Sequence, residues 1–134
     1  MKIEILYPQC CNLFGDLSNI DYLRKCLPQA EFVETSLTDE PLFATEPVDM
    51  VYLGPMTERS QRMVLERLLP YRKRMWELIG GDTVFLFTGN ALELAGEYII
   101  QEDGSRLNCL EIFPLYAKQD MMHRHNSVFL GNFE

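Results

Sequence analysis

Thr88 is the side chain whose type and position most suggest chemistry in this sequence. It follows the apolar run of residues 83–87 and begins the segment Thr88-Gly89-Asn90, so we predict a sharp turn from a strand into a helix. Such a turn places one side chain above the N–H groups of a helix start, where a nucleophile and a developing oxyanion are both stabilised. Because no histidine, lysine or free amine lies nearby in the sequence to act as a base, we favour a helix N-cap for Thr88 over a nucleophile.

Two further groups of residues carry metal-binding or redox side chains. Asp120, His123 and His125 could ligate a metal, but one segment supplies too few ligands, and we favour a solvated hairpin loop. Cys10 and Cys11 could form a redox or nucleophilic pair after the first strand. No neighbouring basic residue would lower a thiol pKa there, so we favour thiols without chemistry. The sequence therefore predicts neither a metal site nor a cofactor.

The helical segment before Thr88 carries the densest basic patch, Arg72, Lys73 and Arg74. We interpret this patch as a solvated helix face, with contact to an acidic partner or a phosphate as the alternative. Apolar residues at helical spacing in the same region favour core packing over a cofactor-binding surface. These residues are Met63, Leu65, Leu68, Leu69, Met75 and Trp76.

The composition limits the classes of function. The chain has 134 residues, of which 47% are hydrophobic, and this suits one globular domain with one core. With 20 acidic and 12 basic residues the formal charge is −8, so nucleic acid is excluded as a partner. No run approaches the roughly 20 apolar residues of a membrane span, and the first residues are too few and too acidic for a signal peptide. The four cysteines lack paired spacing, and we predict a cytoplasmic protein with reduced thiols and no membrane association.

Alternating short apolar strands and amphipathic helices predict the fold. Strands are expected at residues 2–7, 30–36, 48–53 and 83–87, and helices at residues 18–27, 58–69 and 71–79. We expect Ser18 and Asp21 to form a capping box at the first helix. Thr57 should cap the second helix, and Pro70 should kink the chain before the third. This order predicts a flavodoxin-like three-layer α/β domain with a mainly parallel sheet, in which ligands bind at the carboxyl ends of the strands.

Two other regions show no helical pattern. Residues 39–47 have no clear periodicity and are expected to form a loop. After Glu97 the chain contains short apolar segments and a turn signal at Asp103-Gly104, which together predict a C-terminal β-hairpin region. The segments are residues 98–101, 110–116 and 127–133.

Several short motifs occur in one order along the chain. Residues 12–20 read NLFGDLSNI, residues 53–61 read LGPMTERSQ and residues 87–90 read FTGN, with shorter matches at 97–98, 103–107 and 110–113. Together they resemble class I glutamine amidotransferase-like domains of the cobyric acid synthase type, closest to the small amidotransferase subunit of lipid II isoglutaminyl synthase. The resemblance implies one domain over residues 1–134 that hydrolyses glutamine through a cysteine thioester. It also implies a Mur-ligase-like synthetase partner, which uses the ammonia to amidate a cell-wall precursor.

The positions that carry the family's chemistry differ in this chain. Thr88 stands where the resemblance implies the nucleophilic cysteine. Pro55 replaces a glycine whose N–H serves the oxyanion, and proline has no N–H to donate. The resemblance places the catalytic histidine downstream of residue 134, so the sequence is either a fragment or a naturally short domain. Glutaminase activity is therefore not expected of this chain alone. The retained pocket is expected to be formed by Gly54, Pro55, Met56, Gly89 and Asn90.

Two alternatives remain open from the sequence. A longer native protein could be an amidotransferase that uses another nucleophile, or the domain could be a flavodoxin-like module that binds a small ligand or a partner chain without catalysis. Association is a separate expectation. Apolar residues of the segment 127–133, among them Val128 and Leu130, predict that the chain forms a homo-oligomer or binds another subunit through this C-terminal strand and not through the face of Arg72 to Arg74.

Overall fold

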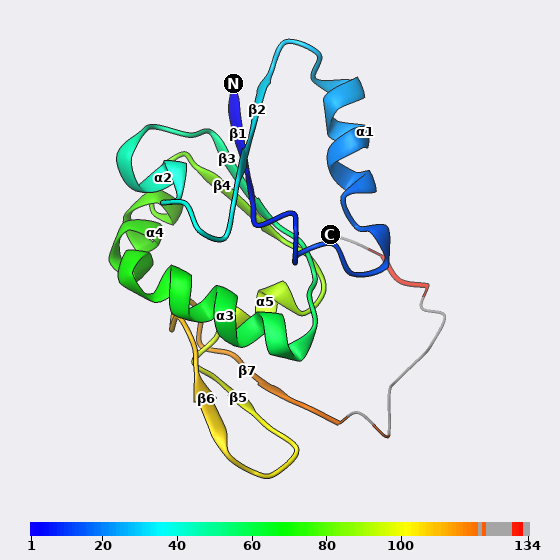
Figure 1. Ribbon diagram of the computed structural model, residues 1–134, viewed down its shortest axis with the longest axis vertical. Coiled ribbons are helices and arrows are strands. Elements are labelled where there is room, and N and C mark those ends of the chain that lie inside the picture. Colours follow the sequence, from blue (N-terminus) through cyan, green and yellow to red (C-terminus); the bar gives the residue numbers. More distant parts are fainter. Residues whose placement is uncertain (121, 123–129, 133–134) are drawn as a thin grey trace.

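Four parallel strands form the central sheet of the computed structural model, which describes residues 1–120, 122 and 130–132 (Figure 1). The strands are β1 (Lys2–Leu6), β2 (Glu31–Thr35), β3 (Met50–Leu53) and β4 (Val84–Phe87). They lie in the order β2-β1-β3-β4, and each neighbouring pair is parallel. All four strands therefore end at the same edge of the sheet.

Helices cover both faces of this sheet (Figure 1). They are α1 (Ser18–Cys26), α2 (Leu42–Thr45), α3 (Glu58–Leu68) and α4 (Arg72–Ile79). On one face Ile20 of α1 packs with Ile5 and Tyr52 of the strands. The other three helices lie on the opposite face, over the larger part of the core. The prediction of a flavodoxin-like three-layer α/β domain with a parallel sheet is confirmed.

The helical segment after β3 begins and bends where the sequence predicts. The side chain of Thr57 caps α3 by accepting a hydrogen bond from the N–H of Ser60 at 3.2 Å. α3 ends at Leu68, and a 3-10 turn, η2 (Leu69–Tyr71), joins it to α4. Pro70 lies inside this turn, because it has no N–H to continue an α-helix.

Only half of the apolar side chains that the sequence predicts to face the core are buried in the structure. Leu65, Leu68 and Met75 are buried as predicted, but Trp76 is 56% exposed. Met63 and Leu69 are also exposed, so half of the predicted stripe does not pack in the core. The interpretation was wrong for Leu69 and Trp76 because it counted the periodicity through Pro70, although α3 ends at Leu68 and η2 follows. Met63 lies within α3 but outside its buried face.

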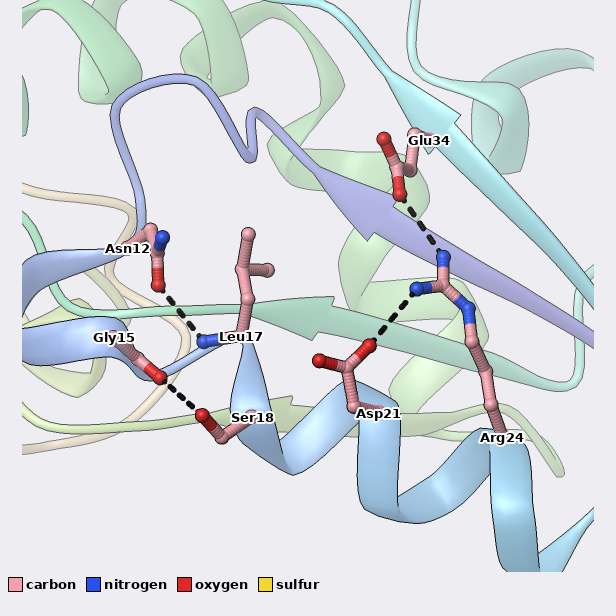
Figure 2. Close-up of polar contacts among 7 residues, drawn as sticks. All are labelled: Asn12, Gly15, Leu17, Ser18, Asp21, Arg24 and Glu34. Carbon is pink, nitrogen blue, oxygen red and sulfur yellow. Dashed lines mark hydrogen bonds and ion pairs between the residues drawn. The ribbon is translucent and has the colours of Figure 1, made fainter.

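The start of α1 differs from the predicted capping box (Figure 2). Ser18 is the first helical residue and not the N-cap, and its hydroxyl donates to the carbonyl oxygen of Gly15 at 2.8 Å. The side chain of Asn12 caps this end instead, because its Oδ1 accepts the N–H of Leu17 at 2.9 Å. The carboxylate of Asp21 pairs with an arginine one turn further along the helix. The capping-box prediction was wrong because the preceding 3-10 turn folds Asn12 back onto the helix start.

A second, smaller sheet follows α5 (Ala91–Leu94), a single helical turn. Its strands are β5 (Tyr98–Ile100), β6 (Arg106–Asn108) and β7 (Tyr116–Lys118). β5 and β6 form an antiparallel hairpin, and β7 pairs with β5 in parallel. The predicted turn at Asp103-Gly104 closes the hairpin, and Gly104 has a φ of 80°, which glycine adopts without strain. The predicted hairpin region is therefore present, with a third strand beside it.

The predicted strand at residues 110–116 is wrong. The N–H of Leu110 donates to the carbonyl oxygen of Leu94, and the N–H of Ile112 donates to that of Ala95, each at 2.9 Å. Both side chains are buried. This segment therefore satisfies its backbone groups at the end of α5, and its apolar residues pack there without forming a strand.

Other expectations fall on α2 and on the end of the chain. The expected loop at residues 39–47 contains the single turn α2, which periodicity could not indicate. The predicted strand at residues 127–133 lies mostly outside the described residues, as do His123 and His125. Leu130 is described and belongs to no helix or strand. Within the described ranges, no helix has the length and apolar character needed to cross a membrane.

Candidate functional site

Three loops meet at the carboxyl edge of the central sheet. After β1 the chain passes through a 3-10 turn, η1 (Leu13–Gly15), before it enters α1. After β3 it forms the segment 54–57, and after β4 it forms the turn 88–90. Because β1, β3 and β4 are parallel neighbours, these loops lie side by side. This is the edge at which a doubly wound α/β fold binds its ligands.

The hydroxyl of Thr88 is engaged by a neighbouring carboxylate. Its Oγ1 donates to Oδ2 of Asp16 at 2.5 Å, and the hydroxyl of Tyr52 donates to the same oxygen at 2.9 Å. Burial raises the pKa of Tyr52, so its phenol remains a donor. The N-cap interpretation of Thr88 is wrong, because Asn90 occupies the N-cap of α5 and neither side chain caps the helix. Thr88, Asp16 and Tyr52 form one closed hydrogen-bonded cluster.

The turn after β3 is tied to the turn after β4 by a side-chain amide. The Oδ1 of Asn90 accepts the N–H of Met56 at 2.9 Å, and the Nδ2 of Asn90 donates to the carbonyl oxygen of Met56 at 2.7 Å. Pro55, which precedes Met56 in this turn, has no N–H. Neither residue that follows Gly54 can therefore donate a free N–H to a developing oxyanion.

Two glycines allow these turns to approach closely. A Cβ on Gly54 would lie 2.3 Å from the carbonyl oxygen of Cys11, a distance that no side chain tolerates. A Cβ on Gly89 would lie 2.9 Å from the Cβ of Pro55, and Gly89 has a φ of 54°. Both positions require glycine for steric reasons, and Gly89 also requires it for its backbone conformation. Gly54 thus lets the turn after β3 pack against the loop after β1, and Gly89 lets the turn after β4 pack against Pro55.

A pocket of about 590 Å³ opens at this edge. Pro55, Gly89 and Asn90 line it, whereas Gly54 and Met56 lie buried beneath the surface and Thr88 does not line the wall. The structure thus brings all six predicted site residues together, but only three of them face the pocket. The remaining wall comes from η1, α3, α5 and the end of β7. These residues are Leu13, Phe14, Asp16, Thr57, Glu58, Gln61, Glu93, Lys118, Gln119 and Asp120.

The pocket wall is rich in carboxylates and amides. Four acidic side chains face it, and Lys118 is its only basic residue among those described. Gln61 is buried, and its Nε2 donates to the carbonyl oxygen of Asn90 at 3.0 Å and to Oε2 of Glu93 at 2.9 Å. No cysteine lines the wall in the described part of the chain. The arrangement can bind a small polar molecule that carries ammonium or amide N–H donors, but it presents no thiol nucleophile.

The basic patch of Arg72, Lys73 and Arg74 lies away from this pocket. Arg72 pairs with Glu111, and Arg74 pairs with Glu77 at 3.6 Å, so the basic patch is a helix face with local ion pairs. Asp120 lines the pocket, but His123 and His125 are outside the described residues. Among the residues that are described, no group of three or more His, Cys, Asp or Glu side chains could hold a metal ion.

Sequence reasoning missed the partners of the predicted residues. Asp16 binds Thr88 across 72 positions, and Gln61 reaches Glu93 across 32. Asp16 and Gln61 both lie inside the motifs at residues 12–20 and 53–61, which was a usable signal. Glu93 and Lys118 carry no such signal, because their role depends on where α5 and β7 pack.

In comparisons with known proteins, no family model and no curated sequence matches this chain. The resemblance to glutamine amidotransferase-like domains accordingly rests on its short sequence motifs.

Proposed function

We propose that this chain is a glutamine amidotransferase-like domain that binds glutamine, or a similar small amide, at the carboxyl edge of its sheet without hydrolysing it. The observation that carries the proposal is the pair of turns after β3 and β4. Thr88 occupies the nucleophile position of the resemblance, with its hydroxyl bound to Asp16. The N–H of Met56 is bound to Asn90, so this turn offers no oxyanion donor.

The missing hydrolysis follows from these two features together. A hydroxyl must lose its proton to attack a carbonyl carbon, and a carboxylate is by residue type a weaker base for that step than a histidine. Loss of one oxyanion donor lowers turnover by roughly 10²- to 10³-fold in enzymes that use one. The absence of both a thiolate and this donor removes the two largest contributions to amide hydrolysis.

The chemistry of the pocket wall supports glutamine as the first ligand to test. Free glutamine carries an ammonium group, a carboxylate and a carboxamide. Asp16, Glu58 and Glu93 suit the ammonium group, Lys118 suits the carboxylate, and the backbone around Asn90 suits the carboxamide. By the same resemblance, we propose a cytoplasmic location and a Mur-ligase-like synthetase as partner. We also propose a homo-oligomer, formed through the C-terminal strand.

A second candidate is a flavodoxin-like module that binds an unrelated small ligand. The excess of carboxylates on the wall favours it, because four acids and one lysine suit an amine without a carboxylate better than an amino acid. The two candidates therefore differ in ligand preference, and neither includes hydrolysis.

Binding and hydrolysis are tested separately on the same protein. We expect L-glutamine to shift the amide NMR signals of Gly89, Asn90 and Glu93, and ammonia release to stay at the level of the buffer blank. Lys118→Ala should weaken glutamine binding about tenfold, because one charge-assisted hydrogen bond is lost. Lys73→Ala, on α4 and away from the pocket, is the matched control and should leave binding unchanged.

Two results would contradict the proposal. Ammonia release above the blank that is abolished by Thr88→Ala would show that the domain is catalytic. Pocket shifts with a simple diamine but none with millimolar glutamine would favour the unrelated-ligand module.

A further inference from the structure

Three sulfur atoms gather behind the carboxyl edge of the sheet. The Sγ atoms of Cys10 and Cys11 are 3.7 Å apart, and the Sγ of Cys11 is 4.0 Å from the Sδ of Met56. Cys11 and Met56 are buried in the main core, and Cys10 is half-buried at its edge. None of the three side chains lines the pocket described above, so the sulfur cluster is a separate site, although the backbone of Met56 is bonded to Asn90 at the pocket edge.

The separations fit a common metal ion. With metal–sulfur bonds of about 2.3 Å, two sulfur ligands lie roughly 3.8 Å apart around a tetrahedral ion and about 4.0 Å apart around a trigonal one. The two separations in the structure, 3.7 and 4.0 Å, bracket these values. The sulfur of Cys11 is the shared member of both pairs. Cys10 is half-buried at the edge of the core, so its thiol is the one of the three sulfur groups nearest to solvent.

The backbone holds the two cysteines in this position. The N–H groups of Cys10 and Cys11 both donate to the carbonyl oxygen of Tyr7, at 3.0 and 2.9 Å. Tyr7 itself has a φ of 55°, which turns the chain sharply after β1. On the other side, Gly54 lies against the carbonyl oxygen of Cys11 so closely that no Cβ fits between them. The turn is therefore formed before any ligand arrives, which lowers the entropic cost of binding.

We propose that Cys10, Cys11 and Met56 form a binding site for one soft monovalent metal ion, Cu(I). Thiolate and thioether ligands select Cu(I) over harder ions, whereas zinc sites use three or four thiolate, imidazole or carboxylate ligands. Binding forms two copper–thiolate bonds and releases the two thiol protons to solvent, with no change of oxidation state.

The test is an anaerobic titration of the reduced full chain with Cu(I), in competition with the chromophoric chelator bicinchoninate. We expect one Cu(I) per chain to be removed from the chelator. Cys10→Ser and Met56→Leu should each weaken the affinity at least tenfold, and circular dichroism checks that both variants fold. Met56→Leu conserves volume, so it removes the thioether without opening a cavity.

Cys26→Ser is the matched control, because Cys26 is an exposed cysteine at the end of α1. It should leave the stoichiometry and affinity unchanged, and Ag(I) should reproduce the pattern of all three variants. Failure of the wild-type chain to compete with the chelator would overturn the proposal. Equal affinities of wild type and Cys10→Ser would overturn it as well, and unchanged affinity in Met56→Leu would exclude the three-sulfur site.

Discussion

Glu4 is a fully buried carboxylate in the middle of β1. Its oxygens accept hydrogen bonds from the hydroxyl of Thr35 at 2.5 Å, from the N–H of Leu42 at 2.6 Å and from the N–H of Phe43 at 2.8 Å. These donors satisfy the charge and attach the first turn of α2 to the sheet. The residue is structural, because its contacts all lie within the fold and away from the pocket.

Replacement of this carboxylate should destabilise the protein strongly. In Glu4→Gln one oxygen becomes an NH₂ group that faces the N–H donors of α2, so we expect a loss of about 2–4 kcal/mol. Glu34→Gln is the control, because exposed Glu34 pairs only with Arg24 among the described side chains, at 2.9 Å, and should cost less than about 1 kcal/mol. Urea denaturation of both variants measures the difference, and equal losses would contradict the structural role.

The buried thiol of Cys109 makes the free energy of unfolding depend on pH in the alkaline range. Burial, followed by the charge of Glu93, raises the pKa of the Cys109 thiol to about 11. The thiol of an unfolded chain ionises near about pH 8.5. The protonated thiol therefore favours the folded state below about pH 8.5, and this stabilisation is lost as the pH rises toward about 11.

Comparison with Cys109→Ala isolates this contribution. We expect the difference in unfolding free energy between wild type and the variant to be constant from about pH 6 to 8 and to shift against wild type from about pH 9 to 10.5. Equilibrium urea unfolding at each pH measures it. A difference that stays flat over the whole range would show that the folded thiol ionises as freely as the unfolded one.

At the scale of elements, the N-terminal end of α1 allows a comparison of two helix caps. The sequence predicts a capping box between Ser18 and Asp21, whereas the structure caps Leu17 from Asn12 (Figure 2). Asn12→Ala should therefore cost about 1 kcal/mol, the usual value for a lost helix cap. Asp21→Ala should cost less than about 0.5 kcal/mol, because it removes only an exposed ion pair with Arg24. A larger loss of stability for Asp21→Ala than for Asn12→Ala in thermal unfolding would instead support the capping box.

β4 is one of the two edge strands of the central sheet. The N–H of Val84 donates to the carbonyl oxygen of Asp49, just before β3, and the N–H of Thr88 donates to that of Leu53 in β3. The alternation of a parallel ladder therefore turns the backbone groups of Phe85 and Phe87 to the other side. Among the described residues no strand pairs with that side. Val84 is 58% exposed and Leu86 is 37% exposed, so an open backbone edge lies beside uncovered apolar side chains.

At the scale of the whole molecule, this edge continues into a wider apolar surface. A hollow of about 200 Å³ lies between β4 and α5, and Leu86, Leu92 and Phe113 contribute to it. All three of these side chains are exposed. Surfaces of this kind on a folded chain usually contact a partner. Leu130, part of the predicted C-terminal strand, is 98% exposed and is equally able to contribute apolar area.

Self-association is the corresponding prediction. We expect light scattering to give a mass above the 15.6 kDa of one chain at high concentration, because the apolar edge is buried in the assembly. Leu86→Lys, or Val128→Lys together with Leu130→Lys, should return the mass to that of a monomer. Lys73→Glu, on the charged face of α4, is the control and should leave the mass of the assembly unchanged. A monomer at every concentration, or an oligomer that survives the lysine substitutions on a folded chain, would contradict it.

The order of strands and helices follows from the sequence, because it depends on neighbours within a few positions. Alternation predicts β1, apolar runs predict β3 and β4, and helical spacing predicts α1 and α3. Thr57, Pro70 and Gly104 act through their own side chains or backbone, so a cap, a kink and a hairpin turn are all correctly placed. The motifs also place the candidate site at the turns after β3 and β4. These features need only local information.

Tertiary structure alone decided which groups meet. Asp16 joins Thr88 across 72 positions, Asn90 joins Met56 across 34, and Cys11 lies beside Met56 across 45. Periodicity reports which face of an element is apolar, but it cannot say which carboxylate or amide arrives from another loop. The same limit explains the false strand at residues 110–116, whose apolar residues pack on the end of α5. Hydrogen-bond partners at such separations are set by the packing of whole elements, which a single sequence does not encode in any local pattern.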